Sequence, residues 1–246
     1  MERPASPTAL ADPSKPGAEI PDSIGGFRTR IELVDPEGLA IELVTVRDLE
    51  SRLDRDRLLH DDAYVPPYWA LVWSGSVALA RRLGGDVACA GREILDVGCG
   101  LGAVAVAAAR QGGRVTAIDR EATPVEFLRA TAKRHELPLR AIVADLEQAS
   151  FERRFDLVLC AELLYEKERF TPLARSLDAA LAEGGSIILA DARRVDTSGF
   201  FHALAELGFE ERELGIEETR EEGTLVRIRL VAMRRRSGPS RSGSKV

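Results

Sequence analysis

One segment, residues 93–102 (Glu-Ile-Leu-Asp-Val-Gly-Cys-Gly-Leu-Gly), limits the folds open to this chain more than any other. Its apolar residues around Asp96 are typical of a strand that is covered on both faces of a parallel sheet. Three glycines follow at alternate positions: Gly98, Gly100 and Gly102. Without a Cβ, they let the backbone turn sharply and come close to a ligand. The small residues of 103–110 then predict a helix that packs tightly on the sheet.

The next predicted strand, 114–118, ends in a second carboxylate, Asp119, so that two acids lie at two successive strand ends. A carboxylate such as Asp119 can accept hydrogen bonds from the hydroxyl groups of a ribose. The spacing Gly98-x-Gly100-x-x-Ala103 also satisfies the fingerprint of dinucleotide binding. However, Asp96 would repel the pyrophosphate that a dinucleotide places at the helix N-terminus. The two acids therefore favour a nucleoside ligand with positive charge and no phosphate; the alternative is a crossover whose glycines serve packing alone.

This pattern resembles the first two motifs of the class I methyltransferases that depend on S-adenosylmethionine (SAM). SAM has the required charge, because both its α-ammonium and its sulfonium are cationic. The resemblance implies SAM as the cofactor. We expect these residues of the two motifs to bind it: Asp96, Gly98, Cys99, Gly100, Gly102, Asp119 and Arg120.

A third acid, Asp145, comes directly after the predicted strand 139–144 and is followed by Leu146. In class I methyltransferases an acid at this position commonly accepts a hydrogen bond from the adenine amino group. The resemblance therefore implies that Asp145 and Leu146 bind the cofactor, and ligands in such sheets do bind at the carboxyl ends of strands. The alternative is that Asp145 caps the short segment 147–150.

The fourth predicted strand, 155–160, is followed by Ala161-Glu162-Leu-Leu-Tyr165. This sequence resembles the acid-x-x-Tyr/Phe motif of seven-β-strand methyltransferases, which include many protein lysine methyltransferases; Glu162 replaces the more frequent Asp. We expect Ala161 to bind the cofactor, and a helical turn to bring Glu162 and Tyr165 to one side. Glu162 would accept a hydrogen bond from an incoming amine, and Tyr165 would form an aromatic wall. The alternative is a solvent-facing glutamate beside a packed tyrosine.

Residues 67–75 (Pro-Tyr-Trp-Ala-Leu-Val-Trp-Ser-Gly) carry both tryptophans of the chain, Trp69 and Trp73. The segment resembles the region before the SAM motif in lysine methyltransferases of the electron-transfer-flavoprotein β-subunit type and in their nicotinamide N-methylase-like relatives. Its apolar spacing predicts a helix over 66–82, with both tryptophans on one face. We expect Trp69 to pack in the core and Trp73 to border the cofactor. Residues 190–193, Ala-Asp-Ala-Arg, similarly resemble the family's Gly/Ala-Asp-Pro-x-Arg motif, with alanine in place of proline.

From residue 93 to residue 190, predicted strands alternate with predicted helices, which indicates a parallel sheet. Residues 210–216 and 224–233 flank a polar turn and predict a closing antiparallel pair. The expected fold class is therefore α/β: a Rossmann-like, doubly wound sheet of seven mostly parallel strands with an antiparallel last strand. Residues 27–46 alternate like a β-hairpin, which would extend this fold at its N-terminal side.

The ends of the chain differ in composition from its centre. Residues 1–21 include five prolines, and 234–246 hold five basic residues and no acid among Ser, Gly and Pro. Neither segment has an apolar pattern, so we expect both to be disordered. Between them we expect a single SAM-dependent methyltransferase domain over 22–233, of which 22–65 form a hairpin or lid extension.

Charge and composition limit the classes of partner that we expect this chain to bind. The net charge is −6 although the last thirteen residues are basic, so the body of the chain is acidic. An acidic body disfavours nucleic acid and favours a basic, lysine-bearing protein surface. No apolar run reaches membrane-spanning length, and the three cysteines lack metal-ligand spacing. We expect a cytoplasmic monomer that binds neither a metal nor a membrane.

Together these features predict a SAM-dependent N-methyltransferase that acts on lysine side chains of a protein substrate. A small-molecule N-methyltransferase with a nicotinamide-like or amine acceptor shares nearly the same motifs and stays open as an alternative. A third interpretation is a SAM-binding module without catalytic activity.

Overall fold

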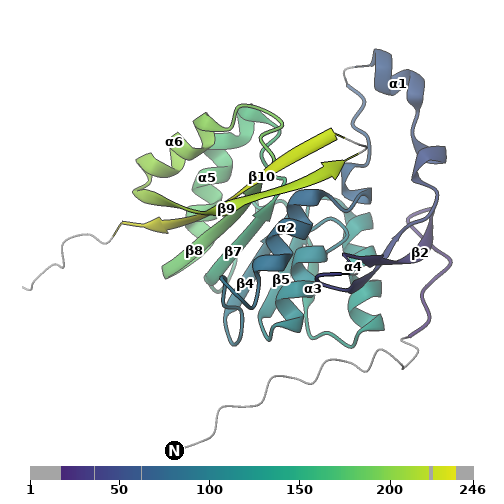
Figure 1. The fold of residues 1–246 in the computed structure, drawn as a ribbon, viewed down its shortest axis with the longest axis horizontal. Helices are drawn as coiled ribbons and strands as arrows, with labels where there is room; N and C mark the ends of the chain where they lie inside the picture. The colour runs from purple at the N-terminus through teal and green to yellow at the C-terminus, as the bar shows by residue number, and fades with distance from the viewer. Residues whose placement is uncertain (1–17, 36, 62, 222–223, 237–246) are drawn as a thin grey trace, which may run out of the picture.

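The computed structural model describes residues 18–35, 37–61, 63–221 and 224–236. Its centre is a seven-stranded sheet in the order β6–β5–β4–β7–β8–β10–β9 (Figure 1). The strands are β4 (Glu93–Val97), β5 (Arg114–Asp119), β6 (Arg140–Val143), β7 (Phe155–Ala161), β8 (Leu181–Asp191), β9 (Phe209–Glu221) and β10 (Thr224–Arg235). Neighbouring strands are parallel except at β10, which is antiparallel to both β8 and β9. The predicted Rossmann-like α/β fold with an antiparallel last strand is confirmed.

Helices cover the sheet on both faces. One face carries α2 (Ser74–Arg82), α3 (Ala103–Arg110) and α4 (Ala122–Arg134), and the other carries α5 (Phe170–Ala180) and α6 (Ser198–Glu206). The central strand β4 is buried between the layers: Ile94 belongs to the first core, whereas Leu95 and Val97 belong to the second. This arrangement explains why β4 is apolar from Ile94 to Val97 except at Asp96.

A small antiparallel sheet lies beside α4 (Figure 1). Its strands are β1 (Ser23–Ile24), β2 (Phe27–Val34) and β3 (Ile41–Val46). The predicted hairpin is the pair β2–β3, and β1 adds a strand that the sequence pattern did not predict. The backbone N–H of Val44 donates to Oγ1 of Thr131 in α4 at 2.9 Å, which ties this sheet to the domain. A 3₁₀ turn, η1 (Leu49–Arg52), and a short helix, α1 (Arg55–His60), follow, and α1 projects away from the rest.

The last two strands are longer than predicted. β9 continues to Glu221, into the expected polar turn, and β10 continues to Arg235, into the expected C-terminal tail. The two strands pair along their whole length, which satisfies their backbone groups beyond the apolar residues. The remaining residues of the two expected tails, 1–17 and 237–246, lie outside the described residues. Within the described ranges, no helix has the length and apolar character needed to cross a bilayer.

Candidate functional site

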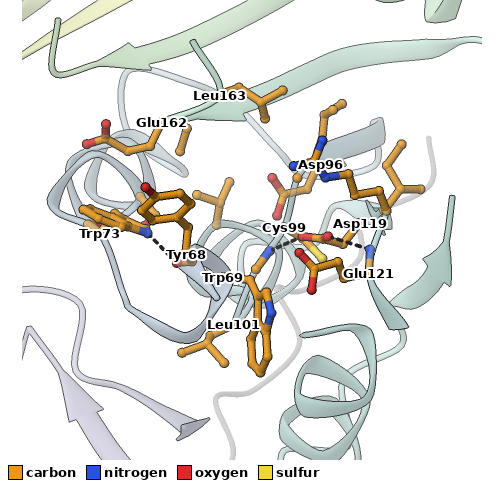
Figure 2. A pocket seen from close by; sticks show the side chains of 18 of the residues that line it. Tyr68, Trp69, Trp73, Asp96, Cys99, Leu101, Asp119, Glu121, Glu162 and Leu163 are labelled. Atoms are coloured by element: carbon orange, nitrogen blue, oxygen red, sulfur yellow. Dashed lines mark hydrogen bonds between the residues drawn. The ribbon is translucent and has the colours of Figure 1, made fainter. Parts of the chain in front are cut away.

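A cavity opens at the carboxyl ends of β4, β5, β6 and β7, where sheets of this kind carry their ligands. Every residue predicted from sequence to bind the cofactor or to act in catalysis lines it: Trp73, Asp96, Gly98, Cys99, Gly100, Gly102, Asp119, Arg120, Asp145, Leu146, Ala161, Glu162 and Tyr165. Figure 2 shows two groups of side chains in this cavity. Asp96, Asp119 and Glu121 gather at one end, and Glu162 lies with two aromatic side chains at the other.

The turn from β4 into α3 depends on its glycines. Gly98, Gly100 and Gly102 have φ values of 65°, 49° and 88°, a region that residues with a Cβ rarely adopt. At Gly102 a Cβ would lie 2.3 Å from a side-chain carbon of Leu128 in α4. The glycines therefore allow the backbone of the turn to form part of the cavity wall.

Asp119, at the end of β5, is held by the backbone on both sides. Its Oδ2 accepts a hydrogen bond from the N–H of Gly100 at 3.0 Å, and its Oδ1 accepts one from the N–H of Glu121 at 3.0 Å. The side chain is nearly buried, and this burial raises the pKa of its carboxyl. Burial also raises the pKa of Glu121, although a hydrogen bond with the Trp69 side chain partly lowers it. Two carboxyl groups therefore face this end of the cavity.

Asp96, in β4, is buried more deeply, with 2% of its surface exposed. Its Oδ2 has no hydrogen-bond partner among the described residues. Burial raises the pKa of this carboxyl to about 8; a backbone hydrogen bond from Ala105 opposes the rise, and the nearby Asp119 adds to it. An unpartnered buried carboxyl oxygen is costly unless a ligand supplies a donor or a positive charge. Asp96 therefore suits this end of the cavity to a cationic ligand.

Glu162 follows β7 at the other end of the cavity. Its Oε1 accepts a hydrogen bond from the N–H of Gly75, in the first turn of α2, at 3.1 Å. The guanidinium of Arg194 donates to both carboxylate oxygens, at 3.2 and 3.4 Å. The side chain is 10% exposed, and its burial raises the pKa of the carboxyl while Arg194 opposes that rise. Glu162 is therefore a mostly buried carboxylate held in one orientation.

The predicted helical turn between Glu162 and Tyr165 is wrong. Glu162 has a φ of 54°, and helical structure resumes only at Lys167. Residues 163–166 are not helical, so no helical turn links the two side chains. Tyr165 nevertheless lines the same cavity; it is 45% exposed, and its hydroxyl accepts a hydrogen bond from Arg120 at 3.5 Å.

The predicted single helix over 66–82 is also wrong. The chain forms a 3₁₀ turn, η2 (Tyr68–Ala70), and becomes extended before α2 begins. The indole N–H of Trp73 donates to the carbonyl oxygen of Tyr68 at 2.7 Å and stabilises this interruption. The two tryptophans therefore do not share a helical face. Trp69 is buried in a core cluster, as predicted, whereas Trp73 lies at the start of α2.

Three aromatic rings are neighbours at the Glu162 end of the cavity. The ring centroid of Tyr68 is 6.2 Å from that of Trp73 and 6.3 Å from that of Tyr165. The guanidinium of Arg194 stacks on Trp73, 4.7 Å from its ring centroid. Aromatic faces attract cations, so this end of the cavity combines a carboxylate with surfaces that favour positive charge.

Asp145 lines the cavity and also caps a turn. Its Oδ1 accepts a hydrogen bond from the N–H of Glu147 at 3.0 Å, which is the capping contact considered as the alternative. Arg169 donates to both of its oxygens, at 3.2 and 3.1 Å. These contacts hold the carboxylate in place and leave it lone pairs for a further donor.

Known proteins share this sequence pattern. A family described as a methyltransferase domain matches residues 94–185. The chain is similar to the ubiquinone biosynthesis O-methyltransferase of Rickettsia conorii (31% identity over 102 residues, 42% of this chain and 35% of the relative). It is similar to the electron transfer flavoprotein beta subunit lysine methyltransferase of Danio rerio (32% over 128 residues, 50% of this chain and 48% of the relative). It is also similar to the protein N-lysine methyltransferase METTL21A of Mus musculus (30% over 149 residues, 57% of this chain and 68% of the relative). The chain belongs to the class I SAM-dependent methyltransferases.

The fold of this chain is similar to that of solved methyltransferase structures. Magnesium protoporphyrin IX methyltransferase from Synechocystis PCC 6803, solved with bound SAM, aligns with a TM-score of 0.54 and 19% identity over 75% of this chain and 92% of that one. The chain spans about a third to a half of the length of the first curated relatives that it matches.

The cavity of this methyltransferase fits SAM, the cofactor of its family. The unpartnered oxygen of Asp96 suits a cation, and the carboxylate of Asp119 keeps lone pairs free for hydroxyl donors. The glycine turn lets a ligand approach the backbone. The prediction of SAM as the cofactor is confirmed.

Four polar or aromatic residues described above were not predicted from sequence: Tyr68, Glu121 and Arg169, which line the cavity, and Arg194, which contacts Glu162 from outside it. Tyr68 belongs to the Pro-Tyr-Trp segment, and Glu121 follows Asp119 by two positions. Arg194 is the fifth residue from Ala190, where the Gly/Ala-Asp-Pro-x-Arg motif has its arginine, so three of the four carried a usable signal and Arg169 carried none. Arg169 and Arg194 each reach a carboxylate on a separate element, 24 residues away at Asp145 and 32 residues away at Glu162.

Proposed function

We propose that this methyltransferase transfers methyl groups to the amino group of lysine side chains in a protein substrate. The observation that carries the proposal is the Glu162 end of the cavity, where a mostly buried carboxylate lies near aromatic rings. A lysine has an apolar stem and a cationic head, and such a site accommodates both. Two of the similar proteins are named as lysine methyltransferases, which supports the same reaction.

The opposite end of the cavity would hold the cofactor. Asp119 would accept hydrogen bonds from the ribose hydroxyls, and Asp96 would face the cationic methionine portion of SAM. Asp145 would accept from the adenine amino group beside Leu146. The remaining cofactor contacts would come from the glycine turn and from three residues around it: Arg120, Ala161 and Trp73. When bound, SAM supplies a methyl group that is activated by its sulfonium charge.

The acceptor amine must be uncharged before it is methylated. A lysine has a reference pKa of about 10.4, so it arrives protonated at neutral pH. Removal from water lowers that pKa, and the released proton would pass to the solvent. Glu162 would then accept a hydrogen bond from the neutral amine and direct its lone pair toward the methyl group. Among the described residues its Oε2 accepts from Nε of Arg194 alone, which leaves it a lone pair for this contact.

A small-molecule acceptor is the second candidate. The chain is similar to ubiquinone biosynthesis O-methyltransferases, whose named substrate class is small. The mouth of the cavity also exposes two apolar side chains, Val65 and Leu71, which would suit a compact apolar acceptor. A SAM-binding module without catalysis is distinguished from both by turnover.

The test supplies methyl-labelled SAM and a desalted cell extract to the purified protein and separates the products by size. Glu162→Ala removes the proposed amine contact, and Glu168→Gln is the matched control, because Glu168 is exposed and does not line the cavity. We expect label in protein bands with the parent and the control, and none with Glu162→Ala, while the SAM affinity stays within about twofold. Label found only in small molecules would support the second candidate. No label in either fraction, despite SAM binding, would contradict both.

A further inference from the structure

Arg194, in the loop after β8, contacts three side chains at or beside the Glu162 end of the cavity: Glu162, Glu221 and Trp73. Its Nε and Nη2 donate to the two oxygens of Glu162. Its Nη2 also donates to both oxygens of Glu221, in β9, at 2.9 and 3.0 Å. The central carbon of its guanidinium lies over the ring of Trp73. Arg194 itself is not among the residues that line the described cavity, so its effect on an acceptor passes through these neighbours.

The two carboxylates that Arg194 joins both contact the first turn of α2. Glu162 accepts from the N–H of Gly75, and Glu221 hydrogen-bonds Ser74. A Cβ at residue 75 would lie 2.6 Å from Oε1 of Glu162, so only glycine leaves room for this contact. The loop after β8, the strand β9 and the start of α2 therefore meet at one guanidinium.

The charges where the loop after β8, the strand β9 and the start of α2 meet are balanced only when Arg194 is present. The charged groups that face Glu162 are Arg194 from the loop and Glu221 from β9, and α2 adds the partial positive charge of its N-terminus. Without the guanidinium, two carboxylates would share a mostly buried space, and one of them would tend to take up a proton.

We propose that Arg194 is a positioning residue for methyl transfer, which holds Glu162 ionised and aimed at the acceptor and links that carboxylate to Trp73 and β9. This inference rests on the proposed function. Bidentate contact with one carboxylate, a second carboxylate and ring stacking together require the planar, five-donor guanidinium. Lysine can restore the charge but not this geometry. Arg194 is the fifth residue from Ala190, where the Gly/Ala-Asp-Pro-x-Arg motif has its arginine, whereas its neighbour Arg193 is exposed and makes none of these contacts.

The test compares Arg194→Met and Arg194→Lys with the matched control Arg193→Met. For Arg194→Met we expect kcat at pH 7 to fall about tenfold or more, while SAM affinity stays unchanged. The acidic limb of the profile of kcat against pH should move up by about one pH unit. Arg194→Lys should restore the position of the limb but only part of kcat. Arg193→Met should match the parent. An Arg194→Met protein with the parent kcat and pH profile would overturn the proposal.

A second measurement does not need turnover. Carbon NMR of labelled glutamate, assigned with Glu162→Gln, follows the ionisation of Glu162 in the folded protein. We expect its midpoint to rise by about one pH unit or more in Arg194→Met and to stay unchanged in Arg193→Met. An unchanged midpoint in Arg194→Met would overturn the role of Arg194 whether or not the parent transfers methyl groups. If the Glu162 midpoint rises in Arg194→Met but the parent transfers no methyl groups, the role of Arg194 stands and only the proposed function is refuted.

Discussion

Binding of SAM should release a proton from Asp96. The carboxyl of Asp96 is buried with one unpartnered oxygen, and its pKa is about 8, so at pH 7 roughly ten of every eleven molecules carry a proton there. The proposed contact with the cationic part of SAM needs the ionised form. The apparent affinity is reduced by the fraction of molecules that are competent to bind. Between pH 7 and pH 8 that fraction rises from about one eleventh to one half, which predicts an affinity gain of about fivefold.

Titration calorimetry tests this prediction, because the heat measured in two buffers of different ionisation enthalpy reports the protons released. We expect close to one proton per SAM at pH 7 for the parent. Asp96→Asn keeps the size of the side chain and removes its titration, so the release should disappear. Comparing the two proteins at each pH cancels the ionisation of SAM itself. Equal proton release from both proteins, or equal pH dependence of their affinities, would refute the reasoning.

Three further predictions concern Asp119, Gly102 and Asp35. Asp119→Asn should weaken SAM binding by about tenfold or more in calorimetry, since it removes a charged acceptor from the ribose; unchanged affinity would refute that assignment. Gly102→Ala should lower the free energy of unfolding in urea by about 2–3 kcal/mol, because its Cβ would clash with Leu128 at a positive φ. The control Gly91→Ala should lose about 1 kcal/mol, since Gly91 also has a positive φ but a Cβ there would meet no described residue beyond its chain neighbours within 4 Å. The bidentate contact with Arg81 lowers the pKa of Asp35 from 3.8 to about 2. The ionised Asp35 therefore adds about 1–2 kcal/mol to the free energy of unfolding above pH 4, and this contribution is lost as the pH falls toward 2. Asp35→Asn should therefore be less stable than the parent at pH 6 and equally stable near pH 2 in chemical unfolding, and a constant difference would contradict this.

The strand order and the lining of the cavity follow from local sequence features. A strand buried on both faces, such as β4, must be apolar almost throughout, so Asp96 is conspicuous in it. The glycines mark the turn because only they adopt its φ values without strain. Parallel strands end at one edge, so the acids at or near the ends of β4, β5 and β6 had to lie near one another.

The acceptor end of the cavity was harder to predict because tertiary contacts override the local pattern there. The apolar spacing of 66–82 favours one helix, but the hydrogen bond from Trp73 to Tyr68 stabilises a break in it. Glu162 adopts a left-handed conformation, which no residue other than glycine favours, because Gly75 and Arg194 hold its side chain. The contacts of Glu162 join segments 32 and 87 residues apart, and the hydrogen bond of Trp73 depends on its side chain, so periodicity reports neither.

The chemical identity of the methylated atom decides whether lysine is the acceptor. Protein labelled by this chain with methyl-labelled SAM would be hydrolysed to amino acids and separated against methylated standards. We expect label in methyl-lysine, lost with Glu162→Ala and retained with the exposed control Glu168→Gln. Label in another methylated amino acid, or in a small molecule while protein stays unlabelled, would contradict the proposal that lysine is the acceptor.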